Sequence, residues 1–404
     1  MESKAVNRYL LAGCAAVILS TGAGAANAQA KFDVKVSGDA YFEAGYVSQD
    51  LDANTRSTEF RNRLRVNVIP TAKADNGLEY GARIRMRANS GADNLRNMDA
   101  DRAFIFAQGS FGLVRIGVSN SFSDETYVTA PSDYVSAFVE QPVFWVGPNN
   151  NINGTTGGSL AFGAVQTTRN TIIYPALAVE ANSTKIVYFS PRLAGLQLGA
   201  SYTPRNDSSN TDVSRSQYTA SSAANTMGTG IFEDIWEVGA NYNNSFGGVS
   251  VKASAGYMGG SAVAGAPGIA YNDLSGWQAG VTIGYAGVTI GGSYTDFNRS
   301  GERQSFAVAA GGVPSTEAQR NWTAGVQYAS GSFVVGANYK FGADAGRTDT
   351  PGSRHVNVYE VGAGYTVAPG LTLQAQYDYV DTKGEVSALD DKANVILVRS
   401  VLAF

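Results

Sequence analysis

The stretch Leu371-Thr372-Leu373-Gln374-Ala375-Gln376-Tyr377-Asp378-Tyr379 decides the fold class. Its odd-numbered positions are apolar or aromatic, and its even-numbered positions are Thr, Gln, Gln and Asp. Because side chains point alternately to the two faces of a β-strand, this pattern predicts a strand with one apolar and one mildly polar face. The same alternation recurs in 333–341 and 277–285. It is typical of a strand that separates lipid from a water-filled interior.

Alternating segments of this kind continue through the chain from residue 34 onward. Short Gly-bearing turns and longer polar loops separate them in alternation, and an even number of strands places both termini on the periplasmic side. The sequence therefore predicts an all-β fold, a 16-stranded antiparallel transmembrane β-barrel. The predicted strands are 34–47, 58–70, 78–89, 101–109, 112–119, 182–191, 195–203, 233–245, 249–258, 275–286, 288–297, 320–330, 333–341, 356–368, 371–381 and 392–404.

A soluble β-sandwich would also show alternation. Its outer face, however, would be more charged than the Gly, Ser, Thr, Asn and Gln found here. Aromatic residues also recur at the ends of the apolar faces, where the two interfaces of a membrane lie. These aromatic residues are Phe42, Tyr202, Trp236, Tyr242, Tyr257, Trp322, Tyr328 and Tyr365. Both features favour the membrane barrel.

The first 28 residues have the three parts of a signal peptide. Lys4 and Arg8 precede an apolar run, 9–20, which is too short to span a bilayer, and Ala26-Asn27-Ala28 forms a cleavage motif. We expect export, with cleavage after residue 28 or, alternatively, after residue 30. Residues 29–404 then form the barrel. Cys14 ends a sequence similar to a lipobox, but the apolar run continues past it, which disfavours lipidation.

The C-terminal residue is a phenylalanine. Phe404 ends an alternating strand that carries Ile396, Val398 and Leu402. This ending looks like the signal by which the insertion machinery of the outer membrane recognises barrels. We therefore predict that Phe404 is an assembly signal.

Several motifs, in this order and spacing, resemble the general porins of Gram-negative bacteria, in the proteobacterial branch. They are Val34–Gly38, Asn62–Val68, Gly109–Gly112 with Leu113–Gly117, Ser190–Leu196 and Phe404. The resemblance covers the mature chain. It implies an outer-membrane homotrimer, surrounded by lipid and lipopolysaccharide, with one pore per subunit. It also implies a third loop that folds into the barrel and narrows the pore.

Residues 120–181 are the candidate for this third loop. The segment is far longer than an ordinary connection. It contains Phe138, Val143, Phe144, Trp145 and Phe162, and so many apolar residues favour insertion over a solvated loop. It supplies candidate acidic pore-lining residues, which are Asp124, Glu125, Asp133 and Glu140. An alternative is that 171–179 forms a strand, which would change the register.

Two neighbouring predicted strands carry arginines at every second position, and we call these six residues, together with Arg115, the basic patch: Arg61, Arg63, Arg65, Arg83, Arg85, Arg87 and Arg115. The opposite faces of both strands are apolar. An arginine that faces lipid at mid-depth costs about 2–4 kcal/mol, so these side chains are predicted to face the lumen. With the acidic residues of the third loop on the opposite side, these arginines would create an electric field across the narrowest point of the pore.

These features predict a water-filled channel for passive diffusion of small hydrophilic solutes and ions. A solute-selective, anion-preferring channel of the same fold is the alternative, and a barrel enzyme or adhesin is the alternative from another class. We expect no enzyme, since His355 is the single histidine and no Cys or His cluster is present. No cofactor is predicted, although calcium near Asp124 stays open. The net charge of −4 gives no sign of nucleic-acid binding.

Overall fold

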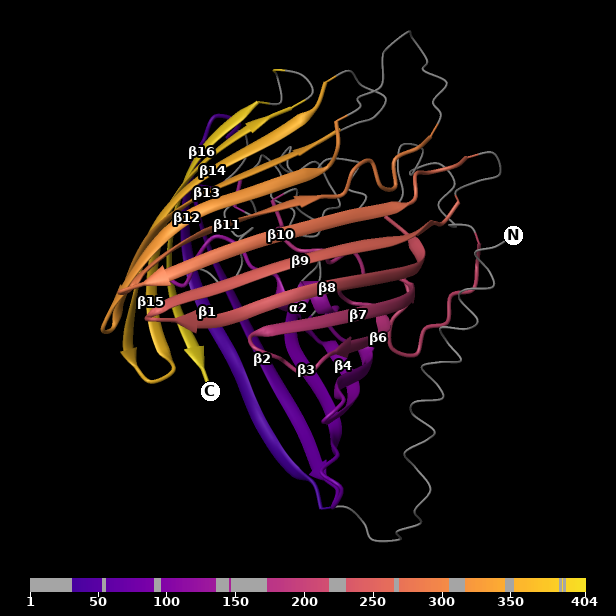
Figure 1. The fold of residues 1–404 in the computed structure, drawn as a ribbon. Coiled ribbons are helices and arrows are strands. Elements are labelled where there is room, and N and C mark those ends of the chain that lie inside the picture. Colours follow the sequence, from indigo (N-terminus) through magenta and orange to yellow (C-terminus); the bar gives the residue numbers. More distant parts are fainter. Residues whose placement is uncertain are drawn as a thin grey trace.

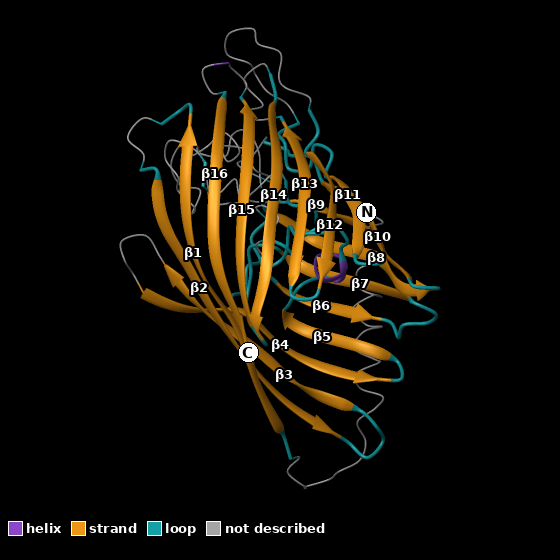
Figure 2. Ribbon diagram, turned by 90° about the vertical axis from the view of Figure 1, so that its left-hand side faces the viewer, coloured by secondary structure: helices purple, strands orange, loops and turns teal. Residues whose placement is uncertain are grey.

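The computed structural model is a closed β-barrel. It describes residues 31–52, 56–90, 96–135, 145–146, 173–217, 230–264, 269–304, 317–345, 352–384, 387 and 390–404. Each strand pairs antiparallel with its neighbours in the sequence, and the last strand pairs with the first (Figures 1 and 2). The predicted all-β, 16-stranded antiparallel barrel is confirmed.

The strands are β1 (Asp33–Gln49), β2 (Thr58–Lys73), β3 (Glu79–Ser90), β4 (Arg96–Gly109), β5 (Gly112–Val118), β6 (Thr184–Phe189), β7 (Leu196–Arg205), β8 (Phe232–Phe246), β9 (Val249–Ala262), β10 (Leu274–Tyr285), β11 (Val288–Asp296), β12 (Arg320–Ser330), β13 (Phe333–Asp344), β14 (Arg354–Ala368), β15 (Leu371–Lys383) and β16 (Asp391–Ala403). A short helix, α2 (Phe122–Thr126), lies between β5 and β6. In the described part of the chain, no helix is both long and apolar enough to cross a membrane.

Each predicted strand corresponds to one observed strand, and the ends differ by at most five residues. The largest difference is at β4, which begins at Arg96 rather than at residue 101. The alternative strand at 171–179 is wrong where it can be checked, because residues 173–179 form turns and irregular backbone. The predicted signal peptide lies outside the described residues.

The two faces of the sheet differ as the alternation predicts. On β15, Leu373 and Tyr377 are 48% and 40% exposed on the outer face, whereas Asp378 on the inner face is 0% exposed. Near the loop end of the barrel, outward aromatic rings contact one another across neighbouring strands, for example Trp236 and Tyr257 with centroids 5.4 Å apart. Such rings are suited to the lipid headgroup region.

Phe404 lies at the seam of the barrel, where the first strand, β1, pairs with the last strand, β16. Its carbonyl accepts a hydrogen bond from Gly38 N (2.7 Å), and its N–H donates to Gly38 O (3.0 Å). The ring lies over Gly38, since a Cβ there would come within 2.6 Å of the ring. The C-terminal residue thus lies against the first strand, at the end of the barrel with the short turns.

We expect Phe404→Ala to lower the yield of folded barrel severalfold. The substitution removes the ring that covers Gly38 while leaving the backbone hydrogen bonds possible. The measurement is the folded fraction after expression, read from heat-dependent mobility on gels. Val398→Ala, which also truncates an outward apolar residue of β16 (55% exposed), is the control. Equal yields for both variants would contradict an assembly role for the terminal ring.

Candidate functional site

We call the connection between β5 and β6, residues 119–183, the inner loop. Its described residues contact the lumen face of strand after strand. Phe122 lies against β7 and β8, Val128 against β9 and β10, and Thr129 against β11 and β12. Tyr134 then reaches β13 and β14, and Val135 reaches β15. Residues 122–135 of the predicted inserted loop therefore lie along one wall, from β7 to β15.

Glycines on the lumen faces of these strands make room for the inner loop. A Cβ at Gly199 would lie 1.8 Å from the Phe122 ring, and a Cβ at Gly280 would lie 1.8 Å from the carbonyl oxygen of Val128. Neither distance is possible for a real side chain. Six glycines, on β7 to β10, β13 and β14, would place a Cβ within 3.0 Å of residues 122–135: Gly199, Gly239, Gly256, Gly280, Gly336 and Gly362. We call them the glycine track.

Hydrogen bonds from lumen-facing side chains fix the backbone of the inner loop. Glu237 accepts from Ser123 N (2.7 Å), and Ser254 Oγ accepts from Val128 N (2.8 Å). Further along, Gln327 accepts from Asp133 N (3.0 Å). Because backbone donors leave water when the loop packs on the wall, these acceptors satisfy them. The loop is therefore anchored at points spread across several strands.

Trp145 of the inner loop contacts β1, which pairs with β16 at the seam of the barrel. Its indole Nε1 donates to Glu43 on β1 (3.1 Å), and its ring covers Gly45. Arg399 on β16 donates from Nε to the second oxygen of Glu43 (2.7 Å), so the carboxylate is shared by a loop residue and the neighbouring strand. An inward apolar cluster packs beside the ring: Val47, Val146, Ile173, Val356, Val358, Val380, Ala393, Val395 and Leu397.

A buried lysine joins the two ends of the inner loop. Lys185 Nζ on β6 donates to the carbonyl oxygens of Ser119 (2.8 Å) and Ser183 (3.0 Å), and also to that of Glu180. Its side chain is 1% exposed. An ammonium has three donors, and here all three bind carbonyls at the beginning and the end of the loop.

The carboxyl group of Glu180 is buried beside this lysine. Burial raises its pKa above the usual 4.5; the Lys185 ammonium opposes the shift, whereas the negative charge of Asp124 adds to it. Because the folded state then binds the proton more tightly than the unfolded state, this group stabilises the seated loop at low pH. That contribution is lost as the pH rises above 4.5 through the raised pKa.

We expect Glu180→Gln to remove this pH dependence. Thermal unfolding of the wild type is expected to move to lower temperature as the pH rises above 4.5, while the variant, which cannot ionise at this position, should shift less. Differential scanning calorimetry in detergent measures both proteins. Parallel curves for the two proteins over this range would contradict a role for Glu180 ionisation.

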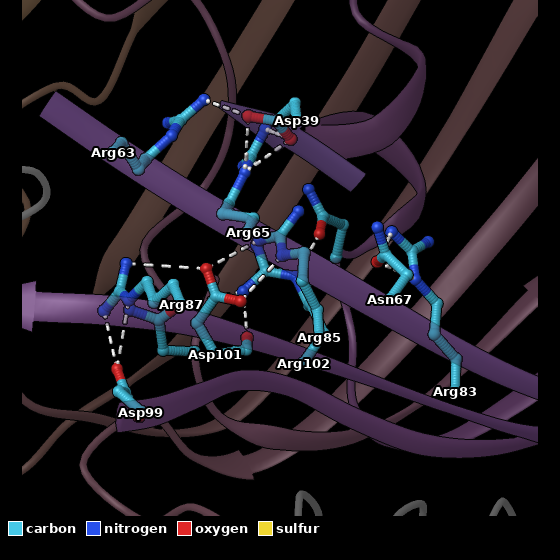
Figure 3. A network of polar contacts seen from close by, with 12 residues as sticks. Asp39, Arg63, Arg65, Asn67, Arg83, Arg85, Arg87, Asp99, Asp101 and Arg102 are labelled. Atoms are coloured by element: carbon cyan, nitrogen blue, oxygen red, sulfur yellow. Dashed lines mark hydrogen bonds and ion pairs between the residues drawn. The ribbon is translucent and has the colours of Figure 1, made fainter. Parts of the chain in front are cut away.

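The basic patch faces the lumen. On β2, Arg63 and Arg65 have side chains that are 13% and 20% exposed inside the barrel, while the intervening Leu64 is 43% exposed on the outer face. On β3, Ile84 is 38% exposed outside, between Arg83 and Arg85. Figure 3 shows the guanidinium groups of these strands gathered into one network.

Acidic and amide partners from neighbouring strands hold the guanidinium groups in place. Asp39 on β1 accepts from both Arg63 (3.1 Å) and Arg65 (2.9 Å). Asn67 accepts twice from Arg83, at 3.0 Å and 2.8 Å (Figure 3). Shared acceptors of this kind keep arginines at fixed positions despite their mutual repulsion.

Arginines of β3 form ion pairs with aspartates of β4. Asp101 accepts two hydrogen bonds of 2.7 Å from Arg85, and Asp99 accepts two from Arg87, of 3.1 Å and 2.8 Å (Figure 3). Arg102 extends the patch toward the inner loop, donating to Asn182 Oδ1 at 2.9 Å. The sequence analysis missed these partners. Their signal is the period of two between Asp99 and Asp101: Asp99 lies opposite Arg87, and Asp101 lies at the β-bulge between the partners of Arg85 and Met86.

The predicted acidic residues of the loop differ in burial and in their hydrogen-bond partners. Asp124 is 5% exposed and accepts from Asn120 (2.8 Å) and Tyr174 (3.1 Å), so it is a structural partner within the loop. Glu125 is exposed and pairs with Arg115, with one hydrogen bond of 2.9 Å. Asp133 is exposed and accepts from Gln327 (2.7 Å). Glu140 lies outside the described residues.

Two further predicted features can be placed. His355 is the second residue of β14, and its ring meets Phe341 edge-on. Within the described ranges, no three His, Cys, Asp or Glu side chains gather closely enough to hold a metal ion.

Comparisons with known proteins agree with this geometry. A family model described as Gram-negative porin matches residues 14–385. Two solved mutants of the Rhodopseudomonas blastica porin are each 18% identical and each align with 92% of this chain and 100% of their own, with TM-scores of 0.54 and 0.53. No curated protein matches. The structural likeness concerns the fold, and the family match covers most of the sequence: the chain belongs to the Gram-negative porin family.

Proposed function

We propose that this outer-membrane porin is a general diffusion channel in which small hydrophilic solutes pass between the basic patch and the inner loop. The observation that carries the proposal is the path of the loop. Residues 122–135 of the loop lie on the wall from β7 to β15, and the arginines of β2 and β3 occupy the opposite wall. A 16-stranded barrel is wide enough to keep an aqueous channel beside such a loop.

Fixed charges of opposite sign flank this passage. The arginines of β2 and β3 line one side, and Glu125 and Asp133 are exposed on the loop. A field across the passage orients dipolar solutes and disfavours apolar ones, which must displace ordered water without compensation. The passage therefore favours sugars, amino acids and ions over apolar compounds of equal size.

A swelling experiment tests passive diffusion. Liposomes containing the refolded protein are diluted into isotonic arabinose, glucose or raffinose, and the swelling rate is followed by light scattering. We expect rates that fall steeply with sugar size and rise in proportion to concentration. Rates that saturate at millimolar sugar, or that are equal with and without protein, would contradict general diffusion.

The alternative of an anion-preferring channel is favoured by one observation. In the ion pairs of β1 to β4, four guanidinium groups share three carboxylates: Arg63, Arg65, Arg85 and Arg87 pair with Asp39, Asp99 and Asp101. A net positive wall attracts anions. Saturation of phosphate current at millimolar concentration would support this alternative, and a current that rises linearly with phosphate would exclude it.

We infer that the protein is exported through a cleaved signal peptide and assembles as a homotrimer. Two observations support the trimer. Most contacting outward aromatic rings lie on β8 to β15, where lipid headgroups would meet them, and one pair, Phe42 and Phe60, lies on β1 and β2. In contrast, β3 and β4 expose aliphatic residues such as Ile84 and Ile105. A flat aliphatic face is suited to contact with another subunit.

Cross-linking tests this arrangement. The only cysteine of the chain, Cys14, lies in the predicted signal peptide, so a single introduced thiol is specific. Ile105→Cys on β4 (59% exposed) is expected to give covalent dimers with a short bis-maleimide, since each subunit carries one thiol and each linker joins two. The matched control is Ile290→Cys on β11 (52% exposed), which should stay monomeric. The reverse result would place the subunit contact on the other side of the barrel.

A further inference from the structure

A cavity lies beneath the inner loop, at the end of the barrel with the short turns. Its volume is about 460 Å³, and the end of α2 with the residues that follow, 125–128, forms its roof. Its walls come from the lumen faces of β5 to β9 and from the turn between β6 and β7. The wall residues are Leu113, Arg115, Phe189, Arg192, Gln197, Asn241, Asn243 and Lys252. Solutes that have passed the loop would meet this cavity on their way to the periplasm.

The lining carries three basic side chains and one acidic side chain. Arg115 pairs with Glu125 of the roof, which leaves Arg192 and Lys252 as the uncompensated positive charges. Lys252 is exposed and, among the described residues, its ammonium has no hydrogen bond or ion pair. A charged group of this kind can bind an incoming anion without first breaking another contact.

Arg192 is held in position by its surroundings. Its guanidinium donates to Gly195 O (2.6 Å), to Gln197 Oε1 (3.0 Å) and to Asn241 Oδ1 (2.7 Å). Asn241 in turn donates to Thr126 O (3.0 Å) in the roof. All of these acceptors are neutral, so the arginine keeps its full charge while its position is fixed. A fixed, uncompensated guanidinium is a suitable partner for a carboxylate or a phosphate group.

Apolar side chains complete the cavity. Leu113 and Phe189 lie on the walls, and Val128 lies in the roof. Phe189 is 5% exposed and packs against Phe122 of α2, with ring centroids 5.3 Å apart, so this surface is rigid. A ligand that fits both parts of the lining has a short carbon chain and a negative group at each end.

We propose that this cavity is a binding site for small organic dianions, held by Lys252 and Arg192, on the periplasmic side of the inner loop. The site shares Arg115 and Glu125 with the passage between the basic patch and the loop, but Lys252 and Arg192, its two binding charges, belong to neither. It would retain anions after they pass the loop and so give the channel an asymmetric response to them. The proposal requires only that the pore conducts, and it does not depend on the trimer or on the selectivity of the basic patch.

The test is a current measurement on single channels of known orientation in a planar bilayer, with succinate added to one side. We expect saturable block from the short-turn side at millimolar succinate and at least tenfold weaker block from the other side. Lys252→Gln and Arg192→Gln should each raise the half-blocking concentration about tenfold, while single-channel conductance in KCl shows that the pore is folded.

Lys73→Gln is the matched control, since Lys73 ends β2 at the same mouth of the barrel but outside the cavity. It should leave the succinate block unchanged. Sulfate, a dianion without a carbon chain, should block more weakly than succinate. The proposal is overturned if succinate block is absent or symmetric, if Lys73→Gln acts like Lys252→Gln, or if sulfate blocks as strongly as succinate. Loss of all conductance in the wild type would instead refute the channel itself.

Discussion

Replacing Arg83, Arg85 and Arg87 together by glutamine is expected to move the reversal potential strongly toward cation preference. The substitutions remove three positive charges from one wall and leave the carboxylates of Asp99 and Asp101 without their partners. A tenfold concentration ratio across the membrane corresponds to about 1.4 kcal/mol per mole of a monovalent ion, and a potential of 100 mV corresponds to about 2.3 kcal/mol per charge. A channel that passes only one ion would therefore have a reversal potential of roughly 60 mV. We expect a shift of about 10–30 mV in tenfold KCl, measured in planar bilayers.

The control for this prediction keeps the charge. Replacing the same three arginines by lysine preserves the positive wall but loses the two-pronged contact of Arg85 with Asp101. That variant should have a reversal potential within a few millivolts of the wild type. If the glutamine variant also stayed at the wild-type value in low salt, where screening is weakest, the arginines would not govern the ions.

The second large effect is expected at the glycine track. In Gly280→Val, the new Cβ would lie 1.8 Å from the carbonyl oxygen of Val128, so the inner loop must leave its seat on β10. Overpacking of this kind costs about 1–3 kcal/mol. The loop would then move into the passage, and we expect lower single-channel conductance and closure at lower voltage than in the wild type.

Ala279→Val is the matched control, because Ala279 is the neighbouring residue on the same strand and points outward. Its conductance and closing voltage should be those of the wild type. If Gly280→Val behaved like this control, the loop would not be seated on β10, and the path of the inner loop would have to be revised.

The strands could be predicted from sequence because the physical signal is local. In a barrel wall, each residue faces either lipid or lumen, so a period of two marks almost every strand. The ends of the strands have a weaker signal in the sequence. β4 begins at Arg96, five residues before the predicted start, because Asp99 and Asp101 pair with arginines of β3 and prolong the sheet beyond the apolar part of the strand.

The path of the inner loop could not be predicted in the same way. Its seat is made by single glycines on strands that are far apart in the sequence, and Gly199 or Gly280 alone resembles any other strand glycine. Only the assembled barrel places them in a row. With the structure in hand, a useful signal is evident: glycine at lumen-facing positions of successive strands, where a pore would otherwise carry polar side chains.

The charges of the site were predicted in part. The period of two placed the arginines of β2 and β3 on the lumen face, since lipid exposure would be costly. Burial of individual acids depends on tertiary contacts, and the sequence could not distinguish Asp124, which is enclosed by Asn120 and Tyr174, from its exposed neighbour Glu125.

The central claim is that this barrel holds an open aqueous channel between the basic patch and the inner loop. Single-channel recording of the refolded wild-type protein in KCl tests it most directly. We predict discrete steps whose conductance is ohmic at low voltage and rises in proportion to the salt concentration. Folded, heat-modifiable protein that inserts into the bilayer and gives no such steps would contradict the account, because the inner loop would then close the barrel.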